Sequence, residues 1–205
     1  MIRPDDVVLI LLAAGRSERF GDIGSKLDEL FLNRPLGLHV AVALEAVSFR
    51  DRIAVVGGAT VDFAAYGFRV LTNEDPSRGM ASSVKIGVEH AKAADAKAVL
   101  IALADMPRIT ATHIYTLFDA FDDDAAVVAS SDGERPSPPA LFGCAQFDFL
   151  LALEGDSGAR DMVRRGKHVV TTPAELIDVD TAEELELLRE LVHAPEAYTR
   201  HHRRP

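Results

Sequence analysis

The sequence predicts a three-layer α/β fold, in which a mostly parallel β-sheet carries helices on both faces. Apolar runs rich in β-branched residues alternate along the 205 residues with segments of helical periodicity, as expected for successive βαβ units. The first apolar run, 7–12, is almost continuously hydrophobic, which is typical of a central parallel strand. The length suits one domain, so we expect a single domain over 1–193 and a flexible tail over 194–205.

The N-terminal half is expected to alternate between strands and helices after the strand at 7–12. Pro35 suits the first turn of a helix that we expect over 34–47. Pro76 and Gly79 mark the entry of a second long helix, and the segment also carries two serines that favour a helix start. The other expected elements of this half are strands over 51–58 and 68–73, a short helix over 60–66, and that second helix over 76–94.

The C-terminal half continues the pattern with shorter elements. Thr110 is a candidate N-cap for a helix over 110–121. The polar stretch "SDGERPSP" joins two short apolar runs and predicts a hairpin-like excursion or a lid. The expected strands are 97–103, 125–130, 139–143, 168–172 and 176–180, and an amphipathic helix over 182–192 closes the domain.

Composition excludes several classes of protein. The formal net charge is −10, from 22 basic and 32 acidic side chains, which argues against a general nucleic-acid binder. Cys144 is the only cysteine, so neither an internal disulfide nor a zinc site of several cysteines can form. The apolar run over 7–14 is too short to span a membrane and follows two aspartates, so we expect a cytoplasmic protein.

Four polar segments are expected at the carboxyl edge of the sheet, where open α/β sheets bind their ligands. They are the loop 13–26, the loop 73–83, the turn 104–107 and the turn 178–181. Each follows an apolar run that we interpret as a strand. The chemistry of the protein is therefore expected to lie among these four segments.

The loop "LLAAGRSERFGDIGSK" over 11–26 gathers glycines and cations behind the first strand. It matches neither the P-loop nor the dinucleotide fingerprint. Gly15 lets backbone N–H groups approach an anion, and Arg16, Arg19 and Lys26 add positive charge suited to a triphosphate. The alternative is a simple turn with a solvated basic face. Lys26 has no apolar surface to cover, so we expect it to supply charge rather than architecture.

Asp105 and Asp180 are candidate metal ligands. Asp105 directly follows the strand expected over 97–103, and Asp180 ends the strand expected over 176–180. Carboxylates placed in this way suit Mg²⁺, which commonly takes one or two of them together with phosphate oxygens and water. Asp180 could instead only cap the helix that begins at Ala182.

Six motifs in order resemble those of the MobA-like nucleotidyltransferases, in particular the molybdenum cofactor cytidylyltransferase branch. The glycine loop resembles the family signature and is followed by its lysine. "NEDPSRGMASSVKIGV", "LADMP", "PPALFG", "GDSGAR" and "DVDTAEEL" are similar to the further motifs. The match runs from Val8 to about Leu188. The segment after Lys26 departs from the family, whose members more often carry a lysine and glycine-rich turn there.

The resemblance implies a Rossmann-like nucleotidyltransferase fold and a role for each matched residue. Catalytic roles fall to Lys26, Asp105 and Arg19, and Asp105 and Asp180 would ligate Mg²⁺. The implied nucleotide site comprises Leu12, Ala13, Ala14, Gly15, Arg16, Ser17, Lys26, Asn73, Ser82 and Ser83, and the implied acceptor site comprises Pro139, Gly155, Asp156, Gly158 and Arg160.

The activity that the resemblance implies is transfer of CMP from CTP to molybdopterin, with release of pyrophosphate. "LAAG" in place of the "LAGG" of the guanylyl branch favours CTP over GTP. The alternatives are a guanylyltransferase, a transferase acting on a sugar phosphate or alcohol phosphate, and a non-catalytic protein that delivers the cofactor to a client molybdoenzyme. Retention of both Asp105 and Asp180 argues against the last.

Overall fold

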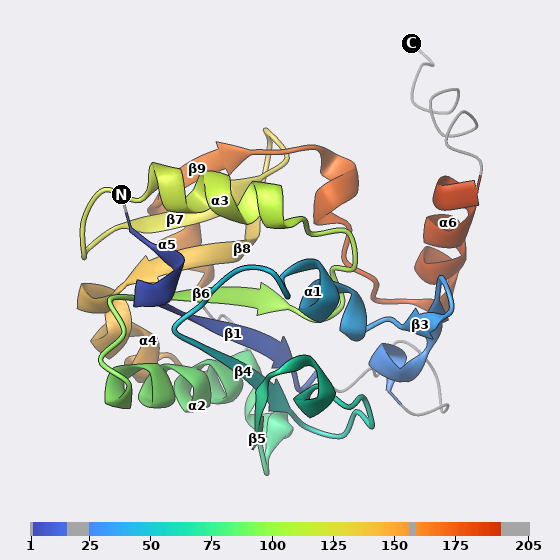
Figure 1. Cartoon of the computed structure of the whole chain (residues 1–205), viewed down its shortest axis with the longest axis horizontal. Coiled ribbons are helices and arrows are strands. Elements are labelled where there is room, and N and C mark those ends of the chain that lie inside the picture. The colour runs from blue at the N-terminus through green and yellow to red at the C-terminus, as the bar shows by residue number, and fades with distance from the viewer. Residues whose placement is uncertain (1, 16–24, 156–158, 194–205) are drawn as a thin grey trace.

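A seven-stranded sheet forms the centre of the molecule (Figure 1). The structure is a computed structural model that describes residues 2–15, 25–155 and 159–193. The strand order of the sheet is β5-β4-β1-β6-β8-β7-β9. The strands are β1 (Val7–Ala13), β4 (Asp51–Val56), β5 (Arg69–Thr72), β6 (Ala98–Leu103), β7 (Val127–Ser131), β8 (Pro136–Gly143) and β9 (Lys167–Val170).

The sheet is mostly parallel. Strands β5, β4, β1 and β6 run in one direction, β8 pairs antiparallel with both β6 and β7, and β7 pairs parallel with β9. The carboxyl ends of all strands except β8 therefore lie at one edge. The β7–β8 connection is a hairpin at that same edge, which confirms the hairpin interpretation of the polar stretch "SDGERPSP".

Helices cover both faces of the sheet, which confirms the predicted fold class (Figure 1). Odd-numbered residues of β1 such as Leu9 and Leu11 pack with α1 and α3, whereas Val8 and Ile10 pack with α2, α4 and α5. Because both faces of β1 are buried, its sequence is apolar throughout. The helices are α1 (Leu38–Ala43), α2 (Met80–Ala93), α3 (Ala111–Ala120), α4 (Phe147–Ala152), α5 (Arg160–Arg165) and α6 (Ala182–His193).

A third, smaller cluster lies beyond the carboxyl edge, where α6 packs against a two-stranded hairpin (Figure 1). The hairpin consists of β2 (Leu30–Phe31) and β3 (Arg34–Pro35). Its turn residues Leu32 and Asn33 have φ angles of 49° and 61°. The helix expected from 34 is therefore wrong at its start, since Pro35 belongs to β3 and α1 begins only at Leu38. The physical reason is that Phe31 and Leu36 are buried against α6.

The strand expected over 176–180 is also wrong. Residues 177–180 have no regular secondary structure. The apolar alternation arises because Ile177 and Val179 pack into the cluster with α6 rather than into the sheet. The short 3₁₀ helices are η1 (Pro4–Asp6), η2 (Lys26–Asp28), η3 (Ala64–Tyr66), η4 (Pro76–Arg78), η5 (Cys144–Gln146) and η6 (Pro173–Leu176).

The remaining expected elements lie within a few residues of their predicted positions. Thr110 caps α3 as expected, since its side chain accepts a hydrogen bond from the backbone N–H of His113. The helix expected over 76–94 divides at Gly79 into η4 and α2. Gly79 has a φ of 83°, a value that glycine adopts without the penalty other residues incur. Within the described ranges, no helix is both long and apolar enough to cross a bilayer.

Candidate active site

Loops that follow β1, β4 and β5 converge at the carboxyl edge of the sheet. A Cβ atom on Gly57 would lie 2.7 Å from Cγ of Pro76 and 3.0 Å from Cβ of Ala14. Only glycine permits this approach, because the contacts are closer than real Cβ atoms make. Ala14 is buried, and within the described residues no atom lies within 4 Å of the position that a Cβ on Gly15 would take. The glycine loop therefore leaves the sheet beside the loop that leads to α2.

Lys26 lies at the start of η2, immediately after the glycine loop. The backbone there is anchored, since Ser25 Oγ accepts a hydrogen bond from the N–H of Leu27, and Leu27 is buried in the core. The Lys26 ammonium lies 2.8 Å from Oδ2 of Asp105 and 2.8 Å from Oδ1 of Asp180. Its side chain is only 8% exposed. One cation thus joins three segments that are distant in the sequence.

Asp105 and Asp180 are held in place by backbone hydrogen bonds. The N–H of Ala104 donates to the Leu12 carbonyl, which extends the β1–β6 contact to the turn. The N–H of Val179 donates to the Asp105 carbonyl at 3.0 Å, and the Val179 side chain is fully buried. These bonds tie the segment before α6 to the end of β6. The two predicted metal ligands are therefore brought together.

Asp180 does not cap α6. The Thr181 hydroxyl accepts from the N–H of Glu184, and the Glu184 carboxylate accepts from the N–H groups of Thr181 and Asp180. This reciprocal arrangement is a capping box. The capping function thus falls to Thr181 and Glu184, and the Asp180 carboxylate is directed to Lys26 instead.

The electrostatics of the site favour a bound cation. Burial alone would lower the pKa of Lys26, but Asp105 and Asp180 outweigh it and raise that pKa. Burial raises the pKa of the Asp178 carboxyl, and the negative charges of Asp105 and Asp180 add to this shift. Lys26 therefore stays charged between two carboxylates. Lys26 was expected to supply charge and to have no structural role. That expectation is wrong, because Lys26 joins the segment of Asp105 to the segment of Asp180.

The donor set of this site fits a divalent metal ion such as Mg²⁺. Oδ1 of Asp105 is buried and accepts no hydrogen bond from any residue that the structure describes. The Lys26 ammonium occupies the position of a cation between two hard oxygen donors. Across 2–15, 25–155 and 159–193, no group of three or more His, Cys, Asp or Glu side chains is arranged to hold a metal ion.

The three predicted nucleotide-pocket residues of the second loop also lie together. Nδ2 of Asn73 donates to Oγ of Ser82 at 2.8 Å and to Oγ of Ser83 at 2.9 Å. Oδ1 of Asn73 accepts from the N–H of Asp75, and Ser82 Oγ donates to the Gly79 carbonyl. Both amide hydrogens of Asn73 are thus used within the loop. The cluster fixes the shape of the segment between β5 and α2.

The predicted acceptor residues that are described lie around the same edge but differ in exposure. Pro139 is buried in β8, and its carbonyl accepts from Ser130 Oγ at 2.7 Å. Gly155 is exposed and its carbonyl accepts from the N–H of Ala81 in α2. Arg160 is exposed at the start of α5. The predicted residues outside the described ranges are Arg16, Ser17, Arg19, Asp156 and Gly158.

The sequence analysis did not identify Asp178 or Glu184 as residues of this site. Asp178 is exposed but close enough to the two predicted metal ligands for their charges to raise its pKa, and Glu184 fixes the backbone that carries Asp180. The pattern Thr-x-x-Glu over 181–184 is the standard sequence signal for a capping box and would have identified Glu184. The alternation of Ile177 and Val179 with aspartates instead suggested a strand over 176–180.

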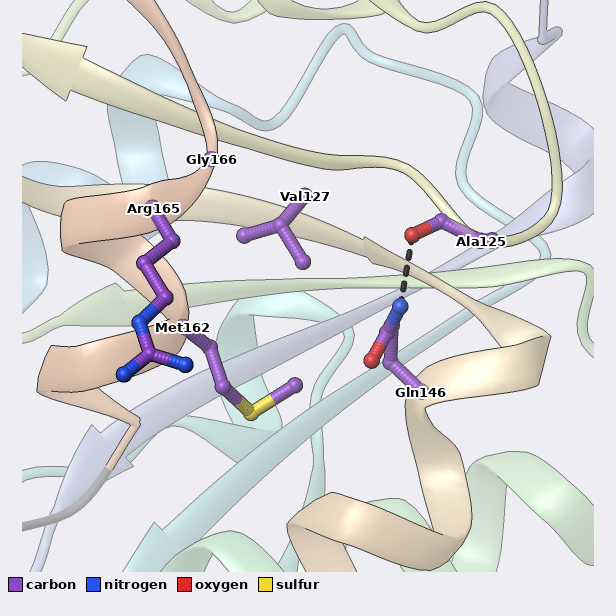
Figure 2. A pocket seen from close by; sticks show the side chains of 6 residues that line it. All are labelled: Ala125, Val127, Gln146, Met162, Arg165 and Gly166. Atoms are coloured by element: carbon purple, nitrogen blue, oxygen red, sulfur yellow. Dashed lines mark hydrogen bonds between the residues drawn. The ribbon is translucent and has the colours of Figure 1, made fainter.

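A separate hollow of about 270 Å³ lies at the opposite edge of the sheet (Figure 2). Met162 and Arg165 of α5 border it on one side. On the other side, Gln146 donates a hydrogen bond to the Ala125 carbonyl. Val127 and Gly166 mark the amino ends of β7 and β9, so this hollow is remote from Asp105. It is not the candidate active site.

A family model for the MobA-like NTP transferase domain matches residues 9–170. The chain belongs to this family. The matched range begins within β1, contains the glycine loop, Lys26 and Asp105, and ends with β9. The site described above therefore lies largely inside the domain that defines MobA-like NTP transferases, with Asp180 just beyond the matched range.

Individual proteins are also similar to this chain. The purine catabolism protein PucB of Bacillus subtilis (strain 168) is 31% identical over 122 residues, which cover 57% of this chain and 58% of PucB. A nucleotidyl transferase from Methanothermobacter thermautotroptrophicus, Mth528, has a TM-score of 0.77 at 17% identity and covers 93% of this chain and 99% of its own.

Molybdopterin-guanine dinucleotide biosynthesis protein A from Archaeoglobus fulgidus has a TM-score of 0.61 at 15% identity, over 91% of this chain and 98% of its own. At these identities the two solved structures show a common fold. The chain spans 58% and 33% of the length of the two curated relatives that it matches.

Proposed function

We propose that the protein transfers CMP from CTP to the terminal phosphate of a molybdopterin-type acceptor and releases pyrophosphate, in a reaction that requires Mg²⁺. The observation that carries the proposal is the position of Lys26 between Asp105 and Asp180, directly behind a glycine loop at the carboxyl edge. This edge is where α/β folds bind nucleotides. The motifs in their order and membership of the MobA-like family support the transferase class.

The reaction places few chemical demands on the protein. An oxygen of the acceptor phosphate attacks the α-phosphorus of CTP, the bond to the bridging oxygen breaks, and pyrophosphate leaves with the electron pair. Catalysis then depends on in-line positioning and on neutralising charge around that phosphorus. Lys26 supplies a permanent positive charge, and the backbone N–H groups of the glycine loop suit phosphate oxygens. Mg²⁺ held by Asp105 and Asp180 would supply further neutralisation when bound.

The preference for CTP rests on Ala14. Its buried methyl group lies against Gly57 at the start of the glycine loop, so a glycine at position 14 would leave a methyl-sized space there. We expect the filled space to suit the smaller pyrimidine. A group of this size discriminates by about 10- to 200-fold.

The variant Ala14→Gly is therefore expected to narrow the ratio of kcat/KM for CTP over GTP without inverting it. The measurement is kcat/KM for both nucleotides with molybdopterin as the acceptor, in the wild type and in the variant. A wild-type preference for GTP would contradict the cytidylyl proposal and favour a guanylyltransferase.

The decisive experiment mixes the purified protein with Mg²⁺, molybdopterin and each of the four NTPs in turn, and measures pyrophosphate and the mass of the product. We expect a cytidine dinucleotide product with CTP and much less product with the others. Transfer to a sugar phosphate or alcohol phosphate instead would contradict the acceptor. Nucleotide binding without pyrophosphate release would indicate a delivery protein. The proposed function also implies a cytoplasmic location and a client molybdoenzyme that receives the product.

A further inference from the structure

The Lys26 ammonium and a divalent metal ion compete for the same oxygens. Asp105 and Asp180 each direct a carboxylate oxygen to the Lys26 nitrogen at 2.8 Å, and these are the two carboxylates that suit a metal. A divalent ion and an ammonium group between the same two carboxylates would repel each other strongly, because the site is largely shielded from water. A metal ion that takes these same two oxygens would therefore displace the Lys26 ammonium from them.

The local structure allows the lysine to leave without unfolding. The backbone at Lys26 is anchored by the turn at Ser25 and by the buried side chain of Leu27. Leu27 packs so closely against Gly37 that a Cβ added to Gly37 would lie 3.1 Å from the Leu27 Cβ. The lysine side chain beyond this anchor is a flexible four-carbon stem. Rotation of the stem can move the ammonium away from the carboxylates while the backbone of η2 stays in place.

The contacts of Lys26 leave one carboxylate oxygen of Asp105 unused. Oδ1 of Asp105 is buried and receives no hydrogen bond within the described residues, whereas Oδ2 contacts Lys26. A buried acceptor without a partner is costly, and a metal ion can use oxygens that a single ammonium does not reach. The site is thus held together by Lys26 but not fully satisfied by it.

We propose that Lys26 is a placeholder cation: it holds Asp105 and Asp180 together in the metal-free protein and must release them when a divalent metal ion binds. This inference rests on the proposed function for the identity of the incoming ligand, the complex of a divalent metal ion with a nucleoside triphosphate. The triphosphate provides new negative partners for the released ammonium. Metal binding is therefore weak without nucleotide and strong with it, which couples the two ligands.

The test measures Mn²⁺ binding to the full chain without nucleotide or acceptor, by the loss of the free Mn²⁺ signal in electron paramagnetic resonance. Lys26→Met is expected to bind Mn²⁺ about tenfold or more tightly than the wild type, because the competing charge is gone. Lys97→Met is the matched control, since Lys97 pairs with Asp6 at 2.9 Å at the other edge of the sheet. It should bind Mn²⁺ like the wild type. Asp105→Asn added to Lys26→Met should remove the gain.

A second measurement uses the wild type alone and so does not depend on the folding of a variant. An amine-reactive reagent and mass spectrometry report the labelling rate of each lysine. Saturating Mn²⁺ should accelerate labelling of Lys26, which it releases from the carboxylates, and leave Lys97 unchanged. Equal Mn²⁺ affinity of Lys26→Met and wild type, or unchanged labelling of Lys26 at saturation, would overturn the inference.

These outcomes are separable from the proposed function, because neither assay contains nucleotide or acceptor. Cation exchange without any transferase activity would contradict only the proposed function. Transferase activity without cation exchange would contradict only the placeholder role of Lys26.

Discussion

Lys26 and Lys97 each pair with aspartate at an end of the same central strands, but at opposite edges of the sheet. The Lys97 side chain is 61% exposed and contacts Asp6, which directly precedes β1. The Lys26 side chain is 8% exposed and contacts two carboxylates from segments far apart in the sequence. The difference shows that burial and convergence, rather than the residue types, distinguish a candidate site from a surface ion pair.

The largest expected difference between the two edges is in activity. Asp105→Asn should lower kcat/KM for nucleotidyl transfer by about 10²–10³-fold or more, because the variant loses a carboxylate that we propose as a ligand of the metal ion. Asp6→Asn makes the same chemical change in a pair whose lysine is 61% exposed and which lies at the other edge of the sheet, and it should leave kcat/KM within about twofold of the wild type. Steady-state kinetics with CTP and varied Mg²⁺ provide the measurement. Equal losses in both variants would indicate a general effect on folding.

The next difference is in stability. Lys26→Ala leaves the Asp105 and Asp180 carboxylates without the cation that they share, and it should lower the free energy of unfolding by about 2–3 kcal/mol. This loss is smaller than the usual cost of breaking a fully buried ion pair, because both aspartates are partly exposed. Lys97→Ala should cost less than about 1 kcal/mol. Urea denaturation at pH 7 gives both values. If the two losses were the same, the depth of the pair would not be the deciding factor.

The smallest difference is expected in the dependence of stability on pH. The pKa of Lys26 is raised from 10.5, so its contribution is present below pH 10.5 and is lost as pH rises through the raised pKa. The pKa of Asp6 is lowered from 3.8, chiefly by its hydrogen bond with Lys97, so its contribution is present above pH 3.8 and is lost as pH falls through the lowered pKa.

These opposite windows can be separated by urea denaturation of the wild type, Lys26→Met and Asp6→Asn from pH 3 to pH 11. The gap in stability between wild type and Lys26→Met should shrink at the alkaline end. The gap for Asp6→Asn should be well under about 1 kcal/mol and should close only at the acid end. A gap for Lys26→Met that stays constant above pH 10.5 would contradict the raised pKa.

The fold was predictable from the sequence wherever an element is defined by its own residues. The run that forms β1 is apolar because both of its faces are covered, and α3 begins after Thr110 because that side chain caps it. Prediction was wrong at the start of the helix expected over 34–47 and over 176–180, where Leu36, Ile177 and Val179 pack into the cluster with α6 rather than into the sheet. In those segments the apolar pattern predicts that the side chains are buried, but it does not predict which element they pack against.

The candidate site was predictable as a set of residues but not as an arrangement. The sequence alone determined that Lys26 follows a glycine loop, that Asp105 follows a core strand, and that carboxylates recur before the last helix. Only the tertiary structure decided that Lys26 lies between Asp105 and Asp180, and that Thr181 rather than Asp180 caps α6. Lys26 and Asp180 are 154 positions apart, so their contact depends on the packing of the sheet, the hairpin and α6 together. Local preferences act over a few residues and cannot specify such a contact, whereas the shared carboxyl edge of the parallel strands can.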